Sequence, residues 1–418
     1  MRAWIEKILK RDHFFKSFLL LATGSSIAQI ITVISSPIST RLYSPDSFGE
    51  YTLITTAVSL FGPILCLKYD MSIVSTDDRE EQLNLIVASF LVGTSISLIV
   101  TFIYSFFILG NSSTLFTFIC LFVLLFSYSS NLVLQAKNNY DSEYGLISKV
   151  TIIKSVVQTG GLILLGAMKL GTIGLVLSQV ISQFSGLFEQ SKSIRKEKKL
   201  FDKVNLDAMI TTLKTNSKQF KYNTPAALFT TLTYSSINLF ISFQYSNSTL
   251  GYYSLSYRML GLPFMLISAN FAKIYYKEAM IEYNDTKKFD KTLKKTLKLL
   301  LVLIVPCMFI LFIIAPELFQ FVFGKKWRVS GEMVQILIPM FALRLIVDSL
   351  TSSYIVANRQ DMEFLLQGSL LLLEIGVYIT TFKFKFSIHV FLLLITIVYS
   401  IIYFINFIFI KKISKGEM

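Results

Sequence analysis

The sequence predicts an all-α integral membrane protein, with about twelve transmembrane helices in two pseudo-symmetric six-helix lobes around a central cavity. The chain of 418 residues is 53% hydrophobic and only 16% charged, which is more apolar than the core of a water-soluble protein requires. Apolar runs of about 20 residues, the length of a helix that crosses a bilayer core, recur along it. The runs are continuous, which argues against a transmembrane β-barrel, because barrel strands are short and alternate in polarity.

Twelve spans follow from these runs in chain order. They are expected at residues 17–39, 50–67, 84–109, 114–136, 146–168, 171–188, 223–245, 250–275, 297–321, 333–357, 362–382 and 387–410. Lys and Arg gather in alternate connections, which is typical of the cytoplasmic side of a membrane protein. The opposite side carries only seven: Arg41, Lys169, Lys325, Lys326, Arg328, Lys383 and Lys385. This asymmetry accounts for the net charge of +14, predicts that both termini are cytoplasmic, and argues against nucleic acid as a partner.

A weak internal repeat flanks a long polar segment near the middle of the chain. The pair Tyr43-Ser44 recurs as Tyr245-Ser246, and each pair leads into the second helix of its half. Because each half contains an even number of spans, the repeat is parallel, and a substrate site is expected where the halves meet. The predicted domains are an N-terminal lobe at 1–190, a cytoplasmic connecting segment at 191–222 and a C-terminal lobe at 223–418.

The connection at 276–296 is a second long polar segment. It carries six lysines: Lys277, Lys287, Lys288, Lys291, Lys294 and Lys295. Apolar residues lie between them, so the segment is either an amphipathic extension on the anionic inner leaflet or a solvated loop that obeys the charge asymmetry.

Charged side chains within the apolar spans give the best indication of what the protein binds. Each costs about 2.5–3.5 kcal/mol to insert, so a retained charge usually faces a bundle interior or a hydrated cavity. Five such residues occur: Lys154, Arg258, Arg344, Asp348 and Glu374. Three further charged residues mark span ends: Arg41, Lys68 and Asp70. The cationic members of these two sets are expected to form a ladder of positive charge from one membrane face to the other.

Each of these charges also has a structural explanation. Arg344 and Asp348 are one helical turn apart and can neutralise each other. Lys154 can extend its ammonium group to the cytoplasmic surface. Glu374 is either a counter-ion for an arginine or a protonatable coupling group. Arg258 has no charged neighbour in its span, which makes it the strongest single candidate for a ligand contact.

Other chemistry is largely absent from the sequence. The cysteines Cys66, Cys120 and Cys307 lie in apolar runs without metal-ligand spacing. The chain has two histidines but no H-E-x-x-H motif, and no phosphate-binding loop. We therefore expect no catalytic residues, no metal and no cofactor, and no ATP-driven transport by this chain alone.

Several segments, in the same order along the chain, resemble bacterial polysaccharide exporters. They are residues 35–51 (SSPISTRLYSPDSFGEY), 67–74 (LKYDMSIV) with 77–81 (DDREE), 251–263 (GYYSLSYRMLGLP), 323–327 (FGKKW) and 335–339 (QILIP). The chain is similar to Wzx-type flippases of O-antigen or capsule units, within the multidrug/oligosaccharidyl-lipid/polysaccharide exporter superfamily.

The resemblance implies movement of an undecaprenyl-diphosphate-linked oligosaccharide from the inner to the outer leaflet of the bacterial cytoplasmic membrane. It implies alternating access coupled to H⁺ or Na⁺, with membrane lipids, a polysaccharide polymerase and a chain-length regulator as partners. The substrate headgroup would meet Arg258, Arg344, Lys154, Arg41 and Lys68, since cationic side chains bind phosphate oxygens. Many relatives carry an acidic residue in the seventh helix where this chain has Asn238. Ion coupling is therefore expected at Asp348, Glu374 or Asp70.

Two other classes of protein compete with this interpretation. A multidrug or metabolite antiporter of the same superfamily would favour acidic cavity residues, whereas the intramembrane charges here lean basic. A membrane enzyme, such as a polymerase or glycosyltransferase, usually needs a large outer loop. No predicted outer connection exceeds about a dozen residues, which argues against an enzyme.

Overall fold

The computed structural model describes residues 13–76, 78–110, 114–196 and 204–417. Within these ranges the chain consists of helices joined by short turns, without any strand, which confirms the all-α prediction. Contacts divide the chain into two compact units, unit 1 ending at Leu239 and unit 2 beginning at Phe240. Residues 197–203 of the predicted connecting segment lie outside the described ranges, and the predicted lobe boundaries stay a prediction.

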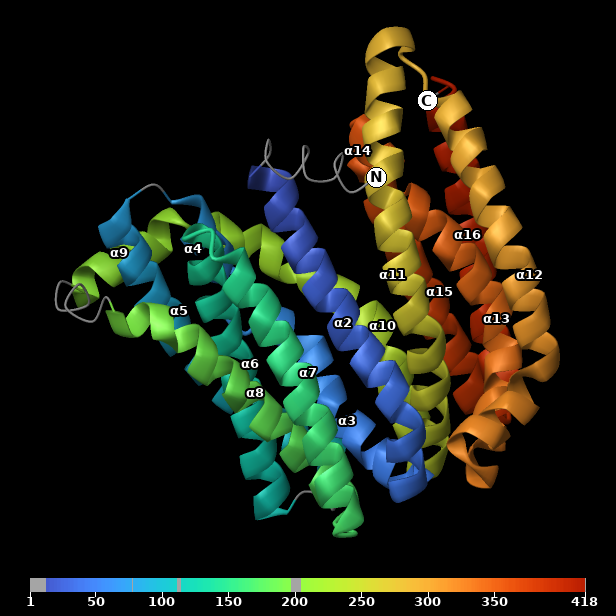
Figure 1. Ribbon diagram of the computed structural model, residues 1–418, viewed down its shortest axis with the longest axis horizontal. Helices are drawn as coiled ribbons and strands as arrows, with labels where there is room; N and C mark the ends of the chain where they lie inside the picture. Colours follow the sequence, from blue (N-terminus) through green and yellow to red (C-terminus); the bar gives the residue numbers. More distant parts are fainter. Residues whose placement is uncertain (1–12, 77, 111–113, 197–203, 418) are drawn as a thin grey trace, which may run out of the picture. The chain divides into compact units, whose positions relative to one another are not determined.

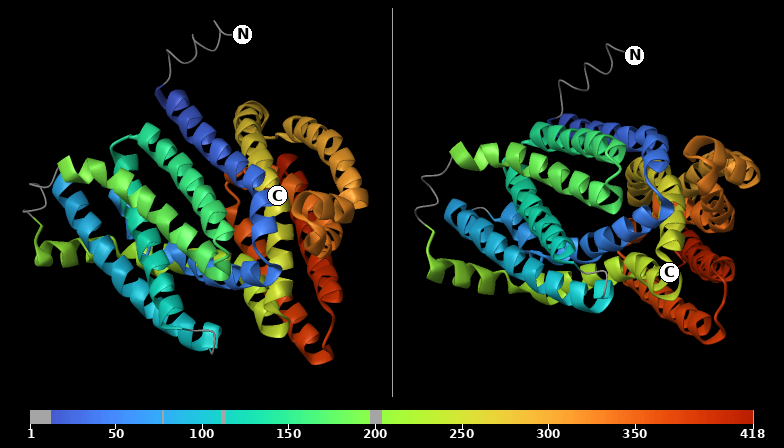
Figure 2. Two further views of the ribbon diagram at one scale, coloured as in Figure 1. Left: turned by 60° about the horizontal axis from the view of Figure 1, so that its bottom comes forward. Right: turned by 90° about the horizontal axis from the view of Figure 1, so that it is seen from below.

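Unit 1 is built from helices that pack through small residues. They are α2 (His13–Leu42), α3 (Pro45–Phe61), α4 (Tyr69–Ser75), α5 (Arg79–Tyr104), α6 (Leu115–Tyr140), α7 (Tyr144–Ala167), α8 (Gly171–Lys196), α9 (Leu206–Thr215) and α10 (Thr224–Gln244), whose last residues belong to unit 2. Helix α7 packs between α2 and α8 (Figures 1 and 2). A Cβ atom at Gly24 would collide with Ser148 of α7, and one at Gly161 would collide with Ser178 of α8. Such small residues allow membrane helices to approach closely without a hydrophobic driving force between them.

The second predicted span is a bent pair of helices, α3 and α4. Ser44 caps α3 by accepting a hydrogen bond from the Ser47 amide at 3.2 Å. The helix ends in a 3₁₀ turn at Gly62–Ile64, which contains a proline that cannot donate to a preceding carbonyl. Lys68 then adopts the left-handed conformation, with φ of 61°, and α4 leaves at an angle of 46°. The break places Lys68 and Asp70 at a corner of the backbone.

Unit 2 is organised around one central helix. Its helices are α11 (Asn247–Thr286), α12 (Asp290–Phe323), α13 (Arg328–Leu350), α14 (Ser353–Val356), α15 (Gln360–Phe384) and α16 (Ile388–Ser414). Helix α13 packs against α11, α12 and α16, and α15 packs against α16. At the contact of α12 and α13, a Cβ atom on Gly331 would lie 2.5 Å from the Ala315 carbonyl oxygen. Only glycine fits there, so Gly331 fixes the distance between the two helices.

The predicted number of spans is close to the observed one. Among the described residues, ten helices are long and apolar enough to cross a membrane, and the bent pair adds an eleventh. The predicted eighth span, 250–275, lies within α11, which is 40 residues long but less apolar than the ten. The polar residues of α11, Arg258 among them, are the reason that it is not among the ten apolar helices.

The repeated Tyr-Ser pairs form the same contacts in both units. Tyr43 and Tyr245 each donate their hydroxyl to a backbone carbonyl, at 2.8 and 2.9 Å. Ser44 and Ser246 each accept a hydrogen bond from the amide three residues on, at 3.2 and 3.1 Å, and so begin α3 and α11. These matched contacts support a true internal repeat rather than a chance similarity of apolar segments.

Candidate functional site

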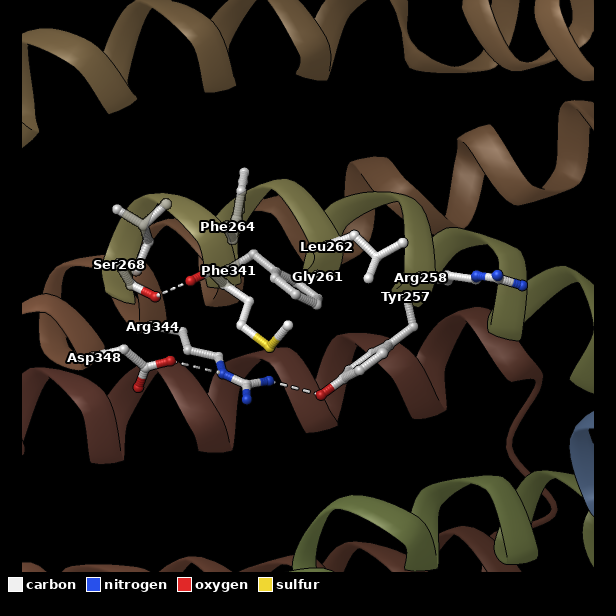
Figure 3. A pocket seen from close by; sticks show the side chains of 11 residues that line it. Tyr257, Arg258, Gly261, Leu262, Phe264, Ser268, Phe341, Arg344 and Asp348 are labelled. Atoms are coloured by element: carbon white, nitrogen blue, oxygen red, sulfur yellow. Dashed lines mark hydrogen bonds and ion pairs between the residues drawn. The ribbon is translucent and has the colours of Figure 1, made fainter. Parts of the chain in front are cut away.

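Unit 2 contains a cavity of about 310 Å³ between α11 and α13 (Figure 3). Its wall is mostly aromatic and aliphatic, and it includes three charged side chains. The lining residues are Tyr257, Arg258, Gly261, Leu262, Phe264, Met265, Ser268, Phe341, Arg344, Leu345 and Asp348. They recur every three or four residues along each helix, which is the spacing that places side chains on one helix face.

Arg344 is held at the cavity wall by residues of both helices. Its Nε lies 3.3 Å from Asp348 Oδ2, and its Nη1 donates a hydrogen bond of 2.6 Å to the Tyr257 hydroxyl on α11. The guanidinium carbon lies 6.0 Å from the centre of the Phe341 ring. The ion pair expected from the spacing of Arg344 and Asp348 is therefore present. The same contacts order the guanidinium in advance, which lowers the entropic cost of binding an anion.

Arg258 lines the same cavity from α11. Figure 3 shows its guanidinium extending away from Arg344 rather than toward it. Among the residues that the structure describes, Arg258 has no hydrogen-bond or ion-pair partner. A half-buried guanidinium without a partner is costly to desolvate, so this side chain is available for an external anion.

Glu374 lies on α15 and is fully buried, with 0% of its surface exposed. Tyr378, one turn further along α15, donates its hydroxyl to Glu374 Oε1. The Tyr378 ring in turn stacks on Phe240, with ring centres 4.5 Å apart. Glu374 does not line the cavity of Arg258, and its role in ion coupling stays a prediction.

Lys154 lies on α7 in unit 1, within a cluster of amide side chains. A Cβ atom on Gly186 of α8 would lie 2.7 Å from Lys154 Cδ, so glycine makes room for the lysine stem. The neighbouring Asn131 is hydrogen-bonded to Gln183 at 3.2 Å and to Gln190 at 2.9 Å. The Lys154 ammonium group forms no hydrogen bond or ion pair within the described ranges. The stem of Lys154 therefore lies beside an amide network.

The remaining predicted residues lie at helix ends of unit 1. Lys68 and Asp70 flank the corner between α3 and α4, and the Asp70 Oδ1 atom is buried without a hydrogen bond to any described group. Arg41 lies exposed in the last turn of α2.

Of the eight predicted residues, the structure brings three into one cavity: Arg258, Arg344 and Asp348. Glu374 belongs to the same unit but lies elsewhere in it. The other four belong to unit 1, so a ladder of cations across the membrane stays a prediction.

Several uncharged residues of the site were not predicted, because the prediction relied on charged side chains within apolar spans. Tyr257 and Phe341 orient Arg344, and nothing in the sequence near Arg344 points to Tyr257, which lies 87 positions away. In unit 1, Tyr51 donates its hydroxyl to Gln179 Oε1 at 3.1 Å, and Gln158 donates to the same oxygen. The only sequence signal for Gln158 and Gln179 is that amide side chains occur within apolar spans.

Comparison with known protein families supports the exporter resemblance. A family profile described as polysaccharide biosynthesis protein matches residues 38–332, well over half of the chain. The chain belongs to this family. No curated protein sequence matches the chain significantly.

Solved transporter structures share this fold. The lipid II flippase MurJ, in an inward closed conformation, gives a TM-score of 0.73 at 18% identity over 95% of this chain and 90% of MurJ. A multidrug resistance MATE family transporter of the MOP superfamily gives 0.68 at 12% identity in its inward-facing form, over 94% of this chain and 98% of its own. An outward-facing structure of a multidrug resistance MATE family transporter of the MOP superfamily gives 0.58 at 13% identity, over 96% of this chain and 96% of its own. At these identities the likeness establishes the fold alone, which this chain shares with these structures.

Proposed function

We propose that this polysaccharide biosynthesis protein moves an undecaprenyl-diphosphate-linked oligosaccharide unit from the cytoplasmic to the outer leaflet of the bacterial cytoplasmic membrane. Its family concerns polysaccharide biosynthesis, and its fold is that of membrane transporters rather than of enzymes. The observation that carries the proposal is the cavity between α11 and α13, where two arginines face a mostly apolar chamber.

The chemistry of this cavity suits a diphosphate headgroup. Arg258 lacks a partner among the described residues, and Arg344 is already oriented by Tyr257 and Asp348. Guanidinium groups bind phosphate oxygens through paired, charge-assisted hydrogen bonds. The aromatic side chains around them exclude water, which strengthens such bonds. A volume of about 310 Å³ lies within the range of ligand sites. The cavity would hold the headgroup, while the polyprenyl tail would stay in the lipid.

Transport is proposed to be coupled to H⁺ or Na⁺ through an acidic residue, either Asp348, Glu374 or Asp70. Asp348 has a direct route to such coupling, because a substrate phosphate would compete with it for the Arg344 guanidinium. An ion bound by Asp348 would release Arg344 for the phosphate, and by reciprocity the bound phosphate would favour binding of the ion. Glu374 has a different basis, since it is a fully buried carboxylate within a predicted membrane span.

The cellular setting of the proposal has two sources. The charge asymmetry of the sequence predicts that both termini are cytoplasmic, and the exporter resemblance implies that the flipped unit passes to a polymerase and a chain-length regulator on the outer side. The resemblance implies that the unit builds an O-antigen or a capsule.

The proposal is tested with Arg258→Ala and Arg344→Ala in cells that depend on this protein for surface polysaccharide. Each is expected to reduce surface polysaccharide at least tenfold, with an unchanged amount of protein in the membrane. Arg328→Ala is the matched control: it lies on α13 too, but pairs with Glu317 and Glu332 on an exposed surface and should have little effect. Normal polysaccharide in both cavity variants would refute the proposal.

The alternative is a multidrug or metabolite antiporter, the activity printed for two of the structural neighbours. Organic cations need acidic cavity residues, whereas this cavity carries two arginines and one aspartate. Efflux of cationic dyes by cells that express the protein, with no effect on polysaccharide, would favour this alternative.

A further inference from the structure

Helices α11 and α12 form a hairpin that continues well beyond the thickness of a membrane. At 40 and 34 residues they are about 60 and 51 Å long, against a hydrocarbon core of about 30 Å. Their connected ends form the tip of the hairpin, beside the carboxyl end of the chain (Figure 1). This is the lysine-rich connection for which the sequence left two interpretations, and it is helical rather than a solvated loop.

The tip of the hairpin is held in one conformation by specific contacts. The Glu282 carboxylate of α11 accepts hydrogen bonds from the first backbone amides of α12, those of Lys291 at 3.2 Å and Thr292 at 2.8 Å. Phe289 is fully buried, and its amide donates to the Ser414 carbonyl at 2.9 Å. The hairpin is therefore a fixed feature of unit 2.

A groove of about 240 Å³ lies between the two helices of this hairpin. One end is apolar, with Phe271, Ile274 and Leu299, and the other end carries Glu278, Lys291 and Lys295. The apolar side chains are open to the surroundings, since Ile274 is 67% and Leu299 is 55% exposed. Because α12 has no charged residue between Lys298 and Glu317, its apolar end faces the membrane and its lysines face the water. The groove thus changes from apolar to cationic across the membrane surface.

The ammonium groups of Lys291 and Lys295 have no partner among the described residues. They lie one turn apart on the groove face of α12, and neither side chain forms an ion pair or hydrogen bond in the described part of the chain. Lys294 is paired with Asp290 at 2.7 Å, and Lys287 lies over the Tyr283 ring. The two free ammonium groups are therefore positioned to bind an anion at the mouth of the groove.

We propose that this groove binds one anionic glycerophospholipid of the leaflet that the hairpin faces, which is expected to be the cytoplasmic leaflet. Lys291 and Lys295 would contact the headgroup phosphate, and an acyl chain would lie along Phe271, Ile274 and Leu299. Basic residues at a membrane surface attract anionic lipids, and the exposed apolar wall suits an acyl chain, which a free phosphate lacks.

The charge of the groove favours a phospholipid over the transported lipid. Two lysines and Glu278 leave one net positive charge, which matches the single negative charge of a phosphodiester better than a diphosphate. The groove also shares no lining residue with the cavity of Arg258 and Arg344. This inference goes beyond the proposed function and does not depend on which substrate is moved.

The test compares two double variants of the full-length protein purified in detergent. K291Q/K295Q removes both groove lysines, and K294Q/K298Q removes two lysines with the same spacing from the neighbouring face of α12. Binding of phosphatidylglycerol and of phosphatidylcholine is measured by native mass spectrometry, with thermal unfolding without added lipid as the check on folding. We expect the wild type and K294Q/K298Q to prefer phosphatidylglycerol by about tenfold, and K291Q/K295Q to lose this preference.

Three outcomes would overturn the inference. An equal loss in both double variants would mean that the general charge of the surface attracts the lipid. An absence of any preference in the wild type would exclude an anionic lipid site. Displacement of phosphatidylglycerol from the wild type by equimolar undecaprenyl diphosphate would instead assign the groove to the polyprenyl lipid.

Discussion

The hydroxyl of Tyr257 is the most specific contact of Arg344, because it comes from a different helix and measures 2.6 Å. A hydrogen bond to a charged group is worth about 1.5–3 kcal/mol, so its loss should weaken anion binding by about 10- to 150-fold. Tyr257→Phe is therefore expected to lower the rate of substrate translocation in proteoliposomes at limiting substrate, and less at saturation.

A second tyrosine of α11 provides the control for this prediction. Tyr252 packs edge-on against Trp327, and its hydroxyl makes no hydrogen bond to a described residue. Tyr252→Phe should leave translocation unchanged. Equal effects of the two substitutions would show that the Tyr257 hydroxyl does not position Arg344.

Glu374 offers a direct test of ion coupling. In Glu374→Gln, the side chain keeps its size and an oxygen that can accept the Tyr378 hydroxyl, but it can no longer bind or release a proton. If Glu374 couples transport to an ion, the translocation rate of this variant should no longer respond to a gradient of H⁺ or Na⁺. Glu332→Gln, on the exposed face of α13, should retain the full response. A retained response in Glu374→Gln would shift the coupling role to Asp348 or Asp70.

The residues of the site show what local sequence can and cannot reveal. The ion pair of Arg344 with Asp348 was predictable, because a spacing of four places two side chains on one helix face. The absence of a partner for Arg258 also followed from its uncharged neighbours within the span. The contact with Tyr257 was not predictable, since it depends on how α11 packs against α13. The environment of Lys154 was missed for the same reason, because its amide neighbours come from two other helices.

At the scale of elements, Gly331 allows α12 and α13 to pack closely, because it has no Cβ atom at their contact. A Cβ atom there would lie 2.5 Å from both the Ala315 carbonyl oxygen and Pro316 Cα, and backbone atoms cannot move aside individually. Overpacking of this kind typically costs about 1–3 kcal/mol. Gly331→Ala is expected to lower the midpoint of thermal unfolding in detergent by several degrees.

A glycine on α15 supplies the matched control. A Cβ atom on Gly376 would meet no other atom within 4 Å, and alanine favours a helix over glycine by about 1 kcal/mol. Gly376→Ala should leave the unfolding midpoint unchanged or raise it. A similar decrease for both variants would mean that the contact at Gly331 can relax.

The lengths of the elements depart from the sequence prediction at polar helix ends. Among the described residues, hydropathy correctly located ten apolar spans and the bent pair but not the predicted eighth span at 250–275, since burial in lipid is what hydropathy measures. It did not predict that α11 continues to Thr286, because this part of the helix is stabilised by contacts such as the buried ring of Phe289. It also missed the break at Lys68, which arises from the conformation of single residues.

At the scale of the whole molecule, the charge asymmetry makes a definite prediction about orientation. Helix α12 runs without interruption from Asp290 to Phe323, so the hairpin tip and the turn before α13 lie on opposite sides of the membrane. The asymmetry predicts that the tip is cytoplasmic and that the turn is outside. Asp285 and Lys326 are exposed at these two positions, and both can be replaced by cysteine in a chain whose three native cysteines have been changed to alanine.

A maleimide that does not cross membranes should label Lys326→Cys in intact cells with a permeable outer envelope. Asp285→Cys should react only after the cytoplasmic membrane is opened, and both variants should first be shown to support surface polysaccharide. The reverse pattern would place both termini outside. A substrate made in the cytoplasm would then enter from the opposite end of the transporter, and the groove of Lys291 and Lys295 would face the outer leaflet. The orientation therefore determines both the direction of the proposed transport and the source of the proposed lipid.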